Sequence, residues 1–266
     1  MEKFFRFAVR RPFLSKALVT LFPGLPLAVA LIWMDVPLAD CWICIALVLF
    51  VLFSLINLSV IILLNPRVKA LNRDCDPLPL LEITGFLLTC PLPASTRITL
   101  SLNHAVALRD MGDYDKALDV IAHIDLSKPR KIPPMVKFVY FHNYADLLDQ
   151  LGRSEDADTC FARATEMYDA IPAKRRTAPL ENAVRLARAT ACCRRQDYAQ
   201  AVELLQDTEG NDLRQRVARG MILARCAAAL GQPRRAEEWL HYVIAHGNRL
   251  DLVRQAGEML KNLENP

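Results

Sequence analysis

The residues best suited to chemistry in this chain are its cysteines and histidines. Cys41 and Cys44 have the C-x-x-C spacing of redox and metal sites. No second pair of this spacing accompanies them, and both stand at the start of a long apolar run. We therefore interpret them as small apolar side chains, with a disulfide between them as the alternative. The cysteines assigned to ordinary helix packing are Cys160, Cys192, Cys193 and Cys226.

The histidines do not form a ligand pair at helical spacing. His241 and His246 are five residues apart and fall on different faces of a helix. The sequence also lacks the H-E-x-x-H, phosphate-loop, G-x-S-x-G and kinase signatures. We therefore predict no enzyme activity, no catalytic residue, no metal site and no cofactor. The net charge of +4 is small and its bases are interspersed with acids, which argues against nucleic acid as a partner.

The distribution of charge divides the chain into two parts. None of the 33 lysines and arginines lies between Ala17 and Leu64. The run from Cys41 to Leu64 has no charge and would extend about 36 Å as a helix, enough to cross a hydrocarbon core of about 30 Å. The run from Ala17 to Met34 is shorter and contains Pro23 and Pro26. We predict a transmembrane hairpin over residues 13–64, with spans at about 17–34 and 41–64.

Basic residues flank this predicted hairpin, and they set its expected orientation. They are dense in residues 1–12 and recur at Arg67, Lys69 and Arg73, whereas the loop between the spans carries only acids. The positive-inside rule then predicts a multi-pass protein of the cell membrane with both termini in the cytoplasm. A cleaved signal peptide in place of the first span is the alternative. Residues 65–94 form a juxtamembrane segment that either covers the first repeat or rests on the bilayer.

One phrase recurs in the remainder of the chain. It consists of a small residue, a turn residue seven positions later, and an alanine five positions after that. Alanines allow two antiparallel helices to pack closely, and a glycine after the first helix can adopt the left-handed cap conformation. Stacked pairs would bury the apolar face that one pair leaves open. The copies are Ala105, Gly112 and Ala117; Ala145, Gly152 and Ala157; Ala189, Gln196 and Ala201; Ala224, Gly231 and Ala236.

This phrase resembles the tetratricopeptide repeat (TPR) family. Met111 to Leu118 reads MGDYDKAL, close to the turn of a TPR, and Phe161 and Ala164 occupy the expected positions of a second helix. The chain departs from the pattern at Gln196 and lacks the signature tryptophan. The resemblance implies an all-α fold in which residues 95–247 form an α-solenoid of about four helix pairs. Residues 248–266 would form a C-terminal capping helix.

The resemblance also implies a binding groove along the inner face of the first helices. We therefore expect a membrane-tethered scaffold or adaptor at the lipid bilayer that captures a peptide or helix of a membrane-associated protein partner. The alternative is a regulatory or assembly subunit of a membrane complex that acts through the hairpin. The family's clamp for C-terminal carboxylates is incomplete, because His142 stands where a lysine is wanted. The expected groove residues are Arg109, His142, Asp146, Asp149, Thr190, Arg194, Met221 and Arg225.

Overall fold

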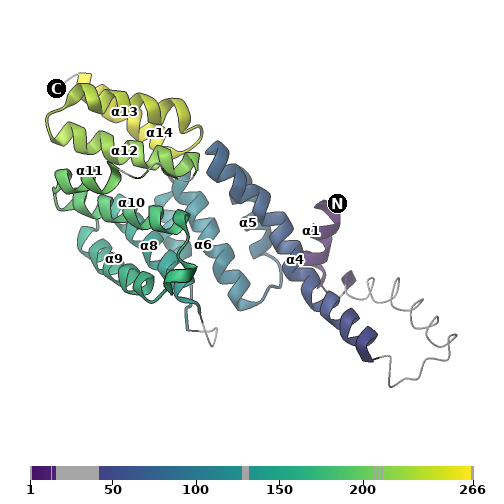
Figure 1. Cartoon of the computed structure of the whole chain (residues 1–266). Helices are drawn as coiled ribbons and strands as arrows, with labels where there is room; N and C mark the ends of the chain where they lie inside the picture. The colour runs from purple at the N-terminus through teal and green to yellow at the C-terminus, as the bar shows by residue number, and fades with distance from the viewer. Residues whose placement is uncertain are drawn as a thin grey trace.

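The computed structural model describes residues 2–12, 14–15, 42–127, 132–206, 208, 210 and 212–264. Every regular element in those residues is helical, and the arrangement fits an α-solenoid (Figure 1). Two helices, α1 (Glu2–Arg10) and α4 (Trp42–Asp74), lie side by side at one end of the molecule. The far end of α4 reaches the body of the solenoid, where it packs against α5 (Leu78–Leu88).

Helices of the body follow one another as antiparallel pairs, and each pair carries one copy of the repeated phrase. The pairs are α6 with α7, α8 with α9, α10 with α11 and α12 with α13, and α14 comes last. Their bounds are α6 (Ala94–Asp110), α7 (Tyr114–Ala122), α8 (Pro134–Gln150), α9 (Ser154–Asp169), α10 (Ala178–Arg194), α11 (Tyr198–Gln206), α12 (Leu213–Ala229), α13 (Pro233–His246) and α14 (Asp251–Glu264), with a short 3-10 turn, η2 (Ala173–Arg175), between α9 and α10.

The turn inside each pair has one geometry, repeated in all four copies. In the first copy the Gly112 N–H donates to the Arg109 carbonyl at 2.9 Å, and the Asp113 N–H donates to the Leu108 carbonyl at 2.9 Å. These are the two hydrogen bonds of a Schellman cap, which needs a left-handed residue at its centre. Gly112 supplies that residue with a φ of +86°. The equivalent residues are Gly152, Gln196 and Gly231, with φ of +74°, +62° and +69°.

Alanines of the repeated phrase lie where the two helices of each pair meet. All eight are at most 2% exposed. A small side chain at these points allows the two backbones to approach closely, so the larger apolar residues between pairs can interlock. Leu147, Leu205 and Leu240 are fully buried in this way.

The end of the solenoid returns to its beginning. The Arg249 N–H donates to the carbonyl of Cys75 at 3.3 Å, and the Asn248 side-chain amide donates to the carbonyl of Asp74 at 2.8 Å. One apolar core joins Leu71 of α4 with Val217 of α12. The last part of the solenoid therefore packs against the C-terminal end of α4.

The predicted transmembrane hairpin is wrong, and so is the cell-membrane location that rested on it. In the part of the chain that the structure describes, no helix combines the length and the apolar character that crossing a membrane requires. Residues 42–64 of the second predicted span are instead the beginning of α4, which continues without a break to Asp74. Val60 and Leu63, near the end of that run, are 5% and 1% exposed and belong to the protein core. The first predicted span, 17–34, lies outside the described residues.

Candidate functional site

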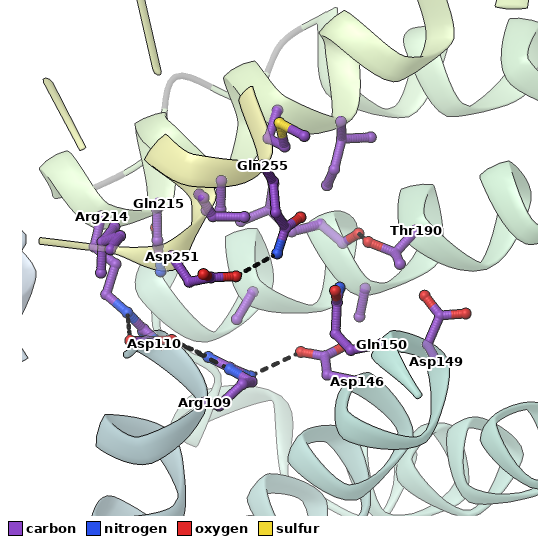
Figure 2. A pocket seen from close by; sticks show the side chains of 18 of the residues that line it. Arg109, Asp110, Asp146, Asp149, Gln150, Thr190, Arg214, Gln215, Asp251 and Gln255 are labelled. Atoms are coloured by element: carbon purple, nitrogen blue, oxygen red, sulfur yellow. Dashed lines mark hydrogen bonds and ion pairs between the residues drawn. The ribbon is translucent and has the colours of Figure 1, made fainter. Parts of the chain in front are cut away.

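Inner faces of the first helices of the pairs enclose a hollow with a volume of about 210 Å³ (Figure 2). Its walls come from α6, α8, α10 and α12, and α14 closes one side. An adjoining hollow shares Asp149, Thr190 and Arg225 with it and is also lined by Arg194. The expected groove residues that line the first hollow are Arg109, His142, Asp146, Asp149, Thr190, Met221 and Arg225.

Two arginines and two aspartates from α6, α8 and α12 form a connected ion-pair network that lines the hollow. Arg109 Nη1 lies 3.0 Å from Asp146 Oδ2, and Arg109 Nη2 lies 3.0 Å from Asp110 Oδ1. Arg214 Nε contacts the other oxygen of Asp110 at 2.7 Å. Figure 2 shows Arg109 between the two carboxylates. Burial alone would raise the pKa of Asp110, but Arg214 and Arg109 outweigh that effect and hold it below its usual value.

His142 faces this network from α8. Its ring stacks on Phe138 with centroids 5.7 Å apart, and its Nε2 lies 3.7 Å from Asp146 Oδ2. Among the described residues, the buried Nδ1 has no hydrogen-bond partner. Burial lowers the pKa of His142, the Asp146 carboxylate opposes that shift, and Arg109 adds to it. The imidazole is therefore neutral at pH 7.

A second ion-pair group lies between α8, α9 and α10. Arg194 Nη2 contacts Asp158 Oδ1 at 3.0 Å, and Arg194 Nε lies 3.6 Å from Asp149 Oδ1. Burial raises the pKa of Asp149, and the charge of Arg194 counteracts only part of that rise. Arg194 is thus occupied by two carboxylates of this chain.

Helix α12 also carries an arginine, Arg225, that makes no ion pair with any described residue. Arg225 Nη2 donates to Gln255 Oε1 at 2.8 Å, and no carboxylate of the described residues lies within ion-pair distance of it. Gln255 Nε2 in turn donates to the hydroxyl oxygen of Tyr114 at 2.7 Å, and Tyr114 donates to Asp251. Arg225 is therefore held in place by a neutral amide, and its charge also acts on Asp149, where it offsets part of the rise in pKa without a direct ion pair.

Comparison with protein families finds the same repeats in two segments. Models of the tetratricopeptide repeat match residues 139–170 and residues 220–241. The chain contains tetratricopeptide repeats. The first match covers most of the TPR formed by α8 and α9, and the second covers the middle of the TPR formed by α12 and α13. A search of curated proteins and a search of solved structures found no match. Membrane anchoring gains no support from these matches.

The TPR register accounts for some lining residues of the hollow and misses others. Arg109, Asp146 and Arg225 occupy inward positions of first helices, which the repeat spacing places from sequence alone. Asp110 adjoins Arg109 and could have been found from the same register. Asp251 and Gln255 enter the hollow only because α14 folds back to α6 and α7, and the repeat period carries no signal for that contact. The polar lining residues that sequence reasoning missed are Asp110, Tyr114, Gln150, Arg214, Gln215, Asp251 and Gln255.

Metal chemistry has no visible site in this part of the molecule. Across the described residues, no group of three or more histidine, cysteine, aspartate or glutamate side chains is arranged to hold a metal ion. The TPR hollow instead offers paired charges, one unpaired arginine and an apolar floor that includes Leu186, Met221 and Ile222. Such a surface recognises side chains through charge and shape.

Proposed function

We propose that the hollow binds a short segment of another protein, so that the chain acts as a protein-interaction scaffold or adaptor. TPRs are typical of such scaffolds, and the two matched repeats support this general class of function. The observation that carries the proposal is the convergence of inward side chains from four successive first helices on one hollow. A solenoid that brings side chains from separate repeats to one place can read several positions of one peptide.

The chemistry of the hollow selects the kind of segment. Arg225 is the cation that lacks a carboxylate, and a partner's acidic side chain would complete its coordination. The neighbouring floor, with Met221 and Ile222, suits an apolar side chain next to that acid. The hollow, with a volume of about 210 Å³, adjoins the second hollow through Asp149, Thr190 and Arg225, so one segment can contact both.

The alternative of a subunit that acts through a membrane hairpin is no longer supported, because the predicted hairpin and its location are wrong. Binding by the hollow does not depend on that hairpin. The residues we propose for partner contact are those of the hollow and its neighbour: Arg109, His142, Asp146, Asp149, Thr190, Arg194, Met221 and Arg225.

Site-specific photo-crosslinking tests this function. A photoreactive residue at Thr190, inside the hollow, should crosslink one defined segment of a partner, which mass spectrometry of the crosslinked peptide identifies. The same residue at Glu166, on the exposed side of α9, is the positional control and should not crosslink that segment. Crosslinking from Thr190 should be lost with Arg225→Glu. The proposal fails if both positions yield the same segments or if the charge reversal changes nothing.

A further inference from the structure

Two cysteines from different repeats meet beside the hollow. Cys193 is the second-last residue of α10, Cys226 lies in α12, and their sulfur atoms are 3.3 Å apart. Both are free thiols, 33 residues apart in sequence. Cys226 belongs to the apolar cluster that also holds Leu205 and Leu223, and Cys193 packs against this cluster. The packing of two repeats therefore fixes a dithiol that sequence spacing does not reveal.

The two thiols differ in how far a reagent can reach them. Cys193 is half-buried and lines the hollow that adjoins the first one, whereas Cys226 is fully buried behind it. The hydrogen bond with Cys226 lowers the pKa of Cys193 despite burial, and the charge of Arg225 contributes to that lowering. The same contact raises the pKa of Cys226. The accessible sulfur is thus the better nucleophile, and the buried sulfur is placed to react second.

We propose that Cys193 and Cys226 form a peroxide-sensitive dithiol that oxidises to a disulfide between α10 and α12. The Cys193 thiolate attacks one oxygen of hydrogen peroxide, the O–O bond breaks, and hydroxide leaves and takes up the proton that the thiol released. The Cys226 sulfur then attacks the sulfenic acid, the S–S bond forms, the S–O bond breaks, and water leaves with the Cys226 proton. Two thiols are oxidised by two electrons, and one peroxide is reduced to two waters.

The sulfur atoms need only a small movement to bond. They must shorten their separation from 3.3 Å to about 2.05 Å. The bridge would join two neighbouring walls of the hollow, because Arg194 follows Cys193 directly and Arg225 directly precedes Cys226. Oxidation would therefore fix these two arginines relative to each other. The disulfide can form whatever the hollow binds, so its test is independent of the proposed function.

Peptide mapping of the full chain after peroxide treatment tests this proposal. The reduced protein is freed of reductant, exposed to hydrogen peroxide, alkylated and digested with trypsin without reduction. The expected product links Ala189–Arg194 to the peptide that begins at Cys226, and reductant separates it again. Cys192 and Cys193 share the first peptide, so the variant Cys192→Ser must give the same link. Cys226→Ser must not, and dimedone should then label a sulfenic acid on Cys193.

Three results would overturn the proposal. The first is a bond between Cys192 and Cys193 inside one peptide, with Cys226 still open to alkylation after unfolding. The second is that Cys193 and Cys226 stay unlinked at a peroxide concentration that already oxidises Cys160 on α9. The third is a link that survives in Cys193→Ser, which removes the half-buried thiol and leaves the fully buried Cys226 in place. Circular dichroism of each variant shows whether it is folded before oxidation.

Discussion

Arg109 on α6 and Asp146 on α8 are joined by an ion pair of 3.0 Å between Nη1 and Oδ2. The same guanidinium also contacts Asp110, which Arg214 on α12 contacts from its other side. Three repeats that are separate in sequence therefore share one charge network. Because its members are largely buried, each charge depends on the others to offset its desolvation.

Removing Arg109 should destabilise the fold strongly. Arg109→Leu leaves Asp146 without its arginine and Asp110 with only Arg214, and breaking such a pair should lower the free energy of unfolding by about 3 kcal/mol. Urea unfolding measures this change. The control is Arg153→Leu, which removes an exposed pair with Asp156 and should cost less than about 1 kcal/mol. Equal losses for the two variants would contradict a buried network.

His142 should make the stability depend on pH. Burial lowers its pKa in the folded chain, so the unfolded chain binds the proton first as the pH falls below about 6.5. Since the unfolded state then holds more protons, the free energy of unfolding falls as the pH is lowered from about 7 to about 5. His142→Gln should flatten this slope, as measured by urea unfolding at several pH values. The control is His123→Gln, which replaces an exposed histidine and should leave the slope unchanged. An unchanged slope in His142→Gln would contradict the role of His142 in this pH dependence.

Gln196 should be a site where glycine stabilises the protein. Its φ of +62° places a side-chain-bearing residue in the left-handed region, which glycine occupies without penalty. Gln196→Gly should raise the free energy of unfolding by about 1 kcal/mol. Gln196→Ala removes the polar side chain but keeps the Cβ, so it should give no such gain. A loss of stability with glycine would show that the turn is not strained.

Alanine at two equivalent turns should have unequal effects. Gly112 and Gly152 both have positive φ, so either substitution costs about 1 kcal/mol through backbone strain. A Cβ at Gly112 would also lie 2.8 Å from Asp251 Oδ1, whereas a Cβ at Gly152 meets nothing within 4 Å. Gly112→Ala should therefore cost about 1 kcal/mol more and speed hydrogen exchange in α14. Identical effects would contradict the closure of α14 onto the turn between α6 and α7.

How much could be predicted from the sequence depends on the range of each interaction. The turn around Gly112 uses residues within five positions of one another, so a short phrase predicts it. The closure of the solenoid joins Arg249 to Cys75, and no periodic pattern specifies which distant surfaces meet. In the predicted span 41–64, Val60 and Leu63 are buried in the protein core, whereas Leu58, Ile61 and Ile62 are exposed. Hydrophobicity alone does not tell that environment from lipid.

The residues of the candidate site also differ in whether local or distant contacts place them. Inward residues of the first helices, such as Asp146 and Met221, follow from the repeat register, whereas Tyr114 and Gln255 join the hollow only through the tertiary contact of α14. The proximity of Cys193 and Cys226 likewise depends on how one repeat stacks on the next.

Binding of the crosslinked partner segment by charge variants at Arg225 tests the central claim most directly. A fluorescent synthetic peptide of that segment is titrated with the wild-type chain, with Arg225→Glu, and with Arg235→Glu, an exposed arginine on α13 that serves as the matched control. We expect Arg225→Glu to weaken binding at least tenfold, a change of about 1.4 kcal/mol, and Arg235→Glu to leave the Kd unchanged. Equal Kd values for the wild type and Arg225→Glu would contradict binding in the hollow.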